Sequence, residues 1–396
     1  MALSEFEQRV CRESERRAET MLRELETLVN IPTGPGSTGL DETRGRLCER
    51  LAKLGAGTRL VPGDPIPEWL GVGAAQSPPT AVCERRVAGA SVHVMLCGHV
   101  DTVHDASSAF NRLTISADRS RCTGPGAVDM KGGLLVAIHA LETLAECGAE
   151  VSFTFALNSD EETGSFASER ALRECAKNAT VGLVFEPAMA DGGLVVERTG
   201  SGQFMLETRG KSAHVGRDFT SGVSAVNAMA RAILRVAELA RPERGVITNV
   251  GPVRADQPAN VVSDLARAWG NARFADATLG DQLGAELDAM QTADGTLPRV
   301  IVRRAFNRPS KPATPEVMKL AEFARAAAAD LGQKLPFGKT GGVCDGNTMQ
   351  AEGLPTIDTL GVRGGGLHTT DEWVEIRSLV ERTQLAAVLI ARLANG

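Results

Sequence analysis

The chain has 396 residues, of which 43% are hydrophobic and 23% are charged, a composition typical of globular proteins. This length exceeds one ordinary hydrophobic core, so we expect two domains, or one domain with a large insertion. The net charge of −6 and the absence of a Lys/Arg cluster argue against a nucleic-acid partner. The apolar runs are too short to cross a bilayer, and the N-terminus does not resemble a secretory signal, so no membrane partner is expected.

Eight cysteines are scattered along the chain without any C-x-x-C pair. Their spacing indicates neither a zinc knuckle nor a redox motif. Several lie in apolar stretches, as small buried side chains do, and free thiols are typical of a reducing compartment. We therefore expect a cytoplasmic protein.

The first 190 residues alternate between helical and strand patterns. Ser4 and Glu7 fit a capping box at the start of the first helix, and a Pro- and Gly-rich loop is expected over 61–80. Strands that alternate with helices predict βαβ units and a mainly parallel sheet. The predicted helices cover 4–30, 43–54, 134–147 and 165–176. The predicted strands cover 91–97, 151–157 and 181–186.

The pattern changes near residue 193, where strands with one exposed face begin. Their order with the intervening helices is β-α-β-β-α-β, which predicts a small ferredoxin-like α+β unit. We therefore predict an α/β domain formed by 1–194 and 312–396, interrupted by a lid domain over 195–311. The predicted elements of the lid are strands at 202–210 and 299–306, one or two strands within 260–275, and helices at 221–240 and 278–291. After the lid we predict a helix over 315–331, a strand over 355–361 and a helix over 376–394.

Histidines and carboxylates follow the predicted strands. In open α/β sheets, ligands bind outside the carboxyl ends of the strands, so these side chains are expected to share one edge. Carboxylates crowded together cannot all stay ionised without cations. Two divalent metals would resolve the repulsion, with one carboxylate bridging them, and zinc accepts such nitrogen and oxygen ligands. The residues at these positions are His99, Asp101, Asp129, Asp160, Glu161, Glu162, Glu186 and His368.

Each of these signals also has an ordinary structural explanation. A histidine after a strand is more often a loop residue than a ligand, and the run 160–162 could be a solvated turn. The stretch "GPGAVDMKGG" lacks the G-K-[ST] ending of a phosphate loop, so its glycines are expected to let the backbone turn around Asp129. The coincidence of several segments at one sheet edge favours the metal site.

Six motifs occur in the order found in the M20 metallopeptidases, which they resemble over roughly residues 20–390: "GHVDTV", "GPGAVDMKGG", "NSDEETGS", "FEP", "GKSAHVG" and "GGLHTTDE". That family includes glutamate carboxypeptidases, acetylornithine deacetylase, succinyl-diaminopimelate desuccinylase and aminoacylases. The resemblance implies that His99 and Glu186 bind one metal. It also implies that Glu162 and His368 bind the other, and that Asp129 bridges the two.

The resemblance implies roles for three further residues. Asp101 would orient the His99 imidazole, Glu161 would be the general base, and His214 would stabilise the oxyanion, in some family members from the partner subunit. The implied cofactors are two divalent metal ions, zinc foremost, although cobalt also suits such ligands. The lid is further expected to exclude water and to form a homodimer.

Two lid segments resemble the glutamate carboxypeptidase G2-like group. "QPANVVSDLARA" makes Asn260 a candidate substrate-binding residue, and "VRRAFN" makes Arg303 a candidate carboxylate anchor. Arg304 stands where that group has proline, so the anchor could be either arginine, and both could instead be solvated residues of a strand.

The resemblance implies hydrolysis of an amide bond that releases a C-terminal amino acid, with glutamate as a candidate, from a small peptide or N-acyl amino acid. A small-molecule N-deacylase of the acetylornithine, succinyl-diaminopimelate or aminoacylase type is the alternative. A non-catalytic metal-binding or scaffold protein is the third hypothesis. It is disfavoured because no implied ligand and no implied base is missing.

Overall fold

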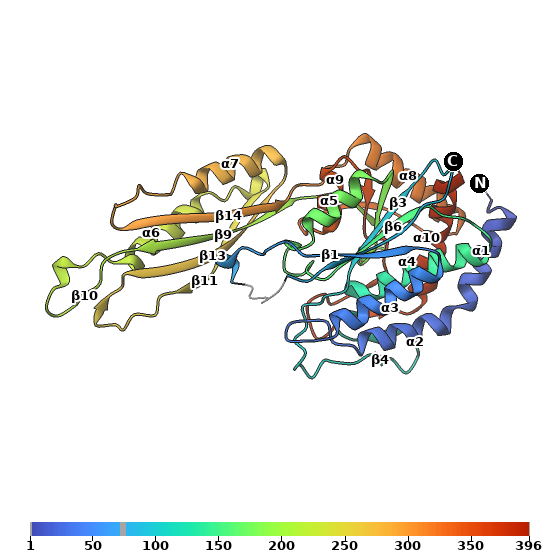
Figure 1. The fold of residues 1–396 in the computed structure, drawn as a ribbon, viewed down its shortest axis with the longest axis horizontal. Helices are drawn as coiled ribbons and strands as arrows, with labels where there is room; N and C mark the ends of the chain where they lie inside the picture. The colour runs from blue at the N-terminus through green and yellow to red at the C-terminus, as the bar shows by residue number, and fades with distance from the viewer. Residues whose placement is uncertain (1, 72–76, 396) are drawn as a thin grey trace.

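The computed structural model describes residues 2–71 and 77–395 and has two bodies along its long axis (Figure 1). The larger body holds both ends of the described chain. The smaller body is elongated and extends away from it. The loop predicted over 61–80 lies partly outside the described residues.

A six-stranded sheet with the order β1-β2-β6-β3-β7-β16 forms the centre of the larger body. The strands β6, β3, β7 and β16 run parallel, which confirms the predicted mainly parallel sheet. The strands β1 and β2 form an antiparallel edge that was not predicted, because they flank the Pro- and Gly-rich loop. The six strands are β1 Gly57–Val61, β2 Thr80–Arg85, β3 Val94–His99, β6 Phe153–Asn158, β7 Val181–Val184 and β16 Thr356–Ile357.

Helices cover both faces of this sheet, and alternate residues of its central strand enter two different cores. Val94 and Leu96 of β3 pack into one core, and Met95 and Cys97 pack into the other. One face is covered by α1 Glu5–Arg16, α2 Ala18–Val29, α3 Leu40–Lys53, α4 Gly132–Glu146, α8 Pro315–Asp330 and α10 Arg377–Asn395. The other face is covered by α5 Glu169–Lys177 and α9 Asp345–Ala351.

The single helix predicted over 4–30 is two helices that meet at Arg17. The predicted capping box is confirmed, because the Ser4 hydroxyl accepts from the Glu7 amide at 3.2 Å and the Glu7 carboxylate accepts from the Ser4 amide at 2.7 Å. Both helices pack on α4 and on α10, and α2 also contacts the turn Ala127–Lys131.

The smaller body is a four-stranded antiparallel sheet, β11-β13-β9-β14, with two helices packed on it. Its chain order is the predicted β-α-β-β-α-β. The strand β11 precedes the stretch 260–275, and sequence patterning missed it because only Val246 of its residues is buried. The elements are β9 Gly200–Arg209, α6 Ala225–Glu238, β11 Val246–Arg254, β13 Leu265–Phe274, α7 Ala277–Asp288 and β14 Arg299–Arg308. A short hairpin, β10 Ala213–His214 with β12 Val261–Val262, projects from the far end (Figure 1).

The remaining short elements complete the larger body. A second four-stranded sheet, β17-β18-β5-β4, lies beside the turn that carries Asp129. Its strands are β4 Thr114–Ile115, β5 Arg121–Thr123, β17 Gly364–Gly365 and β18 Trp373–Glu375. All eight cysteines are free thiols. Among the helices of the described chain, none has the length and apolar character needed to span a membrane.

The chain passes between the two bodies twice, and the two crossings lie side by side. The strand β8 Leu194–Arg198 pairs in parallel with β15 Phe337–Thr340 of the larger body. The backbones of Arg198 and Lys311 exchange two hydrogen bonds of 2.8 and 2.9 Å. The division of the chain at 194/195 and 311/312 stays a proposal. Because β8 pairs with a strand of the larger body, the first boundary is better placed a few residues after 194.

A buried ion cluster of Asp358, Arg198 and Lys311 stabilises the two crossings. The Asp358 carboxylate accepts from Arg198 Nε at 3.0 Å and Nη2 at 2.8 Å, and Lys311 Nζ lies 3.3 Å from it. All three side chains are buried. Burial opposes ionisation of Asp358, but the two cations hold its pKa below the usual value.

We expect Asp358→Ala to lower the free energy of unfolding by about 3–5 kcal/mol, because it leaves two buried cations without their counter-ion. Urea denaturation measures this change. Asp288→Ala is the matched control, since it removes a partly exposed pair with Arg304 and is expected to cost about 0–1 kcal/mol. Equal effects of the two variants would contradict the role given to the cluster.

Candidate metal centre

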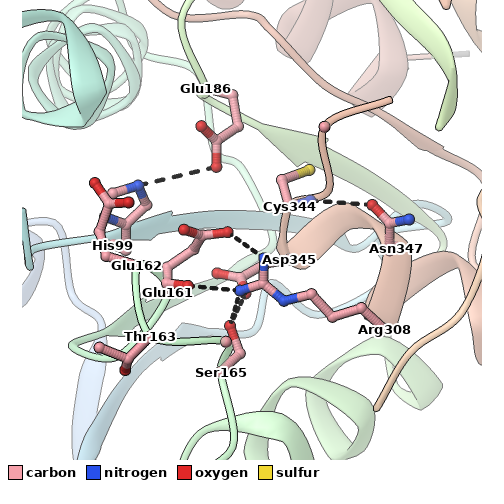
Figure 2. A network of polar contacts seen from close by, with 12 residues as sticks. His99, Glu161, Glu162, Thr163, Ser165, Glu186, Arg308, Cys344, Asp345 and Asn347 are labelled. Atoms are coloured by element: carbon pink, nitrogen blue, oxygen red, sulfur yellow. Dashed lines mark hydrogen bonds and ion pairs between the residues drawn. The ribbon is translucent and has the colours of Figure 1, made fainter. Parts of the chain in front are cut away.

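The predicted ligands come together at the carboxyl edge of the larger sheet. His99 ends β3, Glu162 follows the end of β6, and Glu186 lies just beyond β7. Figure 2 shows His99, Glu161, Glu162 and Glu186 converging on one region, although they come from three segments that lie far apart in the sequence. The parallel arrangement causes this, since all three strands end at the same edge.

Asp129 lies between the two predicted histidine ligands. His99 Nε2 is 3.3 Å from Asp129 Oδ1, and His368 Nε2 is 3.5 Å from Asp129 Oδ2. Glu186 Oε1 is 4.0 Å from His99 Nε2, and Glu162 Oε2 is 3.4 Å from His368 Nε2. Each oxygen of Asp129 thus faces one His/Glu pair, an arrangement suited to a bridging carboxylate.

The donor atoms of this cluster fit a divalent metal. His99 Nε2 and Asp129 Oδ1 are buried and have no hydrogen-bond partner within the described part of the chain. Ligand atoms of His99, Asp129 and Glu162 all lie within 4.8 Å of one another. Buried polar atoms are normally paired, so these unpaired atoms indicate that a further group binds here. Imidazole nitrogen and carboxylate oxygen together form a donor set that zinc accepts.

A tight turn over Ala127–Lys131 presents Asp129, and Glu372 holds that turn. The Glu372 carboxylate accepts from the amides of Gly126, Val128 and Asp129 at 3.0, 2.9 and 3.1 Å. Gly126 has φ +68°, and a Cβ there would lie 2.3 Å from Thr102 Cγ2, so glycine is required. Sequence reasoning missed Glu372, whose only signal was its place in "TTDE".

His104 lies behind the same turn and not among the metal ligands. Its Nε2 is 2.7 Å from Glu372 Oε2, and its side chain is 9% exposed. His104 is therefore a partner of Glu372, the residue that holds the turn.

Asp101 contacts both the ligand His99 and the pair Glu161–Glu162. Its carbonyl and carboxylate oxygens lie 3.0 and 3.4 Å from His99 Nδ1. Its carboxylate also accepts from the amides of Glu161 and Glu162 at 3.3 and 2.9 Å. One aspartate thus fixes the ring of one ligand and the backbone of another, as expected for a residue that orients metal ligands.

The electrostatics of the cluster follow from burial and crowding. Burial, and then repulsion by Asp129, raises the pKa of Glu186 well above its usual value. Hydrogen bonds to Asp129 and Glu162 raise the pKa of His368 to about 10. Burial acts to lower the pKa of His99, but its contacts with Asp101 and Asp129 raise it well above the usual value. Positive charge is therefore needed to stabilise the ionised carboxylates of this site, and divalent metals supply it.

Glu161, the predicted base, lies beside the cluster and is held by an arginine that sequence reasoning missed. Arg308 Nη1 donates to Glu161 Oε1 at 2.6 Å. Burial raises the pKa of Glu161 to about 7, and the positive charges of Arg308 and His99 oppose that rise. A carboxyl group with a pKa near neutrality can both accept and donate a proton.

Within one chain, the structure does not bring His214 and Asn260 to the metal ligands. Both are exposed and lie near the hairpin at the far end of the smaller body (Figure 1). They lie close together, since the Asn260 carbonyl accepts from the Val215 amide at 3.0 Å.

Arg303 and Arg304 lie on opposite faces of β14. Arg304 forms two hydrogen bonds with Asp288 of α7, at 2.9 and 2.7 Å. Arg303 lines a groove of about 720 Å³ on the other face, together with Trp269 of β13 and Trp69. Both arginines are exposed, but only Arg303 lines this groove, and none of the metal-cluster residues lines it.

Arg273, near the end of β13, is a further cation that sequence reasoning missed. Its Nη1 is buried without a hydrogen-bond partner in the part of the chain that the structure describes. Burial, and then repulsion by Arg308, lowers its pKa, while Glu161 acts in the opposite direction. An unpaired guanidinium near the base can bind an anion. The only sequence signal was a basic residue in a strand rich in small and apolar side chains.

A pocket of about 500 Å³ adjoins the metal cluster, and Asp101 and Glu162 lie in its wall. Leu40, Ile66 and Pro78 contribute apolar surface to it, and none of its described lining residues is Lys or Arg. Such a pocket suits an uncharged or apolar group better than an anion.

Comparison with known proteins agrees with this geometry. The family model described as Peptidase family M20/M25/M40 matches residues 95–392. Carboxypeptidase G2 of Pseudomonas sp. (strain RS-16) is 29% identical over 395 residues, which cover 95% of this chain and 90% of that protein. A succinyl-diaminopimelate desuccinylase of Methylobacterium radiotolerans is 27% identical, covering 74% of this chain and 79% of that protein.

Solved structures show the same fold. A tripeptidase of Staphylococcus aureus superposes with a TM-score of 0.75 at 23% identity, covering 96% of this chain and 99% of that one. An M20 family metallo-carboxypeptidase of Sulfolobus solfataricus superposes with a TM-score of 0.74 at 15% identity, covering 95% and 99%. The family match extends over most of the chain, so this protein is a metallo-hydrolase that belongs to peptidase family M20/M25/M40.

Proposed function

We propose that this enzyme hydrolyses an amide bond and releases a C-terminal amino acid, with glutamate as a candidate, from a small peptide or an N-acyl amino acid. The position of Asp129 between His99 and His368 is the observation that carries the proposal. The similarity to a carboxypeptidase over most of both chains supports the substrate class.

Two divalent metals, zinc foremost, would be held by His99 with Glu186 and by Glu162 with His368, with Asp129 shared. When bound, they supply Lewis acidity and lower the pKa of water.

Glu161 performs the proton transfers in this proposal. It accepts a proton from the attacking water as the new carbon–oxygen bond forms. It then donates that proton to the amine as the carbon–nitrogen bond breaks, which leaves a carboxylate and a free amino acid. Its pKa of about 7, raised by burial, suits both transfers near neutral pH.

Arg273 is the proposed anchor for the substrate carboxylate. Its buried, unpaired Nη1 within the described chain and its electrostatic coupling to Glu161 support this role. Arg303 remains a candidate for contacts farther along the substrate, because it faces the outer groove. The carboxylate would thereby fix the scissile amide relative to Glu161.

His214 and Asn260 would act from the partner subunit of a homodimer. Their position at the far end of the lid supports this, as do apolar side chains left exposed on α6 and β11. Those side chains are Val226, Leu234, Ile247 and Val253. The eight free cysteines support the proposed cytoplasmic location.

A small-molecule N-deacylase is the second candidate, and similarity to desuccinylases favours it. The pocket beside Glu162 bears on this choice, since its acidic and apolar lining has no cation among the described residues. A succinyl carboxylate would find no Lys or Arg partner among these lining residues. The pocket therefore favours an N-acyl amino acid with an uncharged acyl group.

Removal of metal is expected to abolish turnover. Protein stripped with a chelator should hydrolyse no substrate in a panel of dipeptides and N-acyl amino acids, and addition of Zn²⁺ or Co²⁺ should restore hydrolysis. Continuous detection of the released amino acid measures this. Undiminished turnover by protein that elemental analysis shows to be metal-free would exclude the proposed function.

Glu161→Gln should lower kcat by about 10²–10⁴-fold, because the amide cannot accept the proton. Metal content, measured by elemental analysis, should stay at the wild-type value. The matched control is Glu174→Gln, an exposed glutamate of α5, which should leave kcat unchanged. A Glu161→Gln enzyme with wild-type kcat would refute the assigned base.

Arg273→Ala should lower kcat/KM by about 10–100-fold on substrates with a free C-terminal carboxylate, through loss of a charged hydrogen bond. The same variant should change kcat/KM little on matched C-terminal amides. Comparing the two substrates in wild type, Arg273→Ala and Arg304→Ala isolates the carboxylate contact. Equal losses on acid and amide would show that Arg273 does not bind the carboxylate.

A further inference from the structure

We infer that Arg308 is a positioning residue that fixes the Glu161 carboxylate and links it to the lid. This inference rests on the proposed function, because it assigns a role to the proposed base. Arg308 is the last residue of β14, the strand by which the chain leaves the smaller body. Its side chain crosses to the larger body and lies among residues of the segment that follows β6 (Figure 2).

The contacts of Arg308 surround the base on two sides. Nη1 donates to Glu161 Oε1 at 2.6 Å, and Nη2 donates to the Glu161 carbonyl at 2.8 Å. Nη2 also donates to Ser165 Oγ at 2.6 Å. One guanidinium thus holds both the side chain and the backbone of Glu161, which restricts the rotamer of the carboxylate.

The other carboxylate oxygen is left available. Oε2 of Glu161 accepts no hydrogen bond from any described residue, whereas Oε1 is bound by Arg308. An arrangement of this kind holds the carboxylate through one oxygen and leaves the second to exchange a proton with water and amine. A purely structural ion pair would need only the oxygen that Arg308 holds. Because the second oxygen stays available for proton transfer, the geometry assigns Arg308 to the orientation of the base.

Arg308 is itself held rigidly. Its side chain is 6% exposed, and Ser165 Oγ donates to Asp345 Oδ1 at 2.6 Å. Asp345 also lies 3.9 Å from Arg308 Nη2 and begins α9. The guanidinium is therefore enclosed by the larger body, although its backbone belongs to the lid sheet.

An irregularity in the lid sheet directs Arg308 toward the base. The pairing of β14 with β9 shifts register between Ala305 and Arg308, before Arg308 pairs with Ser201. Such bulges change the direction of a side chain next to a site. In the same segment, Asn307 Nδ2 donates to the Gly164 carbonyl at 2.7 Å, a second contact between lid strand and base segment. Movement of the lid would thus be transmitted to Glu161.

The test compares Arg308→Ala and Arg308→Lys with Arg304→Ala, an arginine of the same strand that binds Asp288 on the outer face. In the full-length, zinc-loaded enzyme, Arg308→Ala should lower kcat by about 10²-fold while KM changes little, since the base is misplaced but the substrate contacts remain. Guanidinium ion added to this variant should restore part of kcat. Arg308→Lys should fall between wild type and Arg308→Ala, because it keeps the charge but loses the fork.

A second readout does not depend on turnover. Hydrogen–deuterium exchange of the amides over 160–165 should become faster in Arg308→Ala and stay at the wild-type rate in Arg304→Ala. If Arg308→Ala fails to fold, Arg308→Lys is measured in the same way. A wild-type kcat per folded molecule, or unchanged exchange over 160–165, would overturn the inference. If the wild-type enzyme hydrolyses no amide, the proposed function fails, whereas the exchange result still tests the positioning.

Discussion

The arrangement of the site depends on the attraction between crowded carboxylates and the cations that they require. Asp129, Glu162 and Glu186 are brought to one sheet edge, and two histidines face the oxygens of Asp129. Such a cluster has a high electrostatic cost unless positive charge is bound in it. The parallel strands, the turn held by Glu372 and the orienting contacts of Asp101 all keep these donors in place despite that cost.

The two bodies contribute different parts of the proposed reaction. The larger body supplies the metal ligands and Glu161, while the smaller body supplies the cations Arg273 and Arg308 near the same base. Buried contacts at the junction, such as those of Asp358 with Arg198 and Lys311, fasten the chain where it passes between the bodies. The reacting groups can therefore be rigid even though the lid extends far from the metal centre (Figure 1).

The sequence predicted the parallel sheet and the convergence of His99, Glu162 and Glu186 because both follow from strand order. It missed β1 and β2, which flank a Pro- and Gly-rich loop, and it joined α1 to α2 across Arg17. Arg273 and Arg308 could not be predicted, because their importance arises from the meeting of two bodies. Periodicity describes one element at a time and carries no information about such a contact. The different surroundings of Arg303 and Arg304 could not be predicted either, because they depend on the helix α7 lying on one face of β14.

The proposed metal centre depends on Asp129 being shared by two metal ions. Its most direct test is the metal content of purified protein after equilibration with Zn²⁺ and removal of free metal, measured for wild type and Asp129→Ala. We predict two zinc ions per wild-type chain and fewer than one in the variant, with unfolding still cooperative in both. A variant that retains two ions, or a wild-type chain that binds none, would show that Asp129 does not bridge two metals.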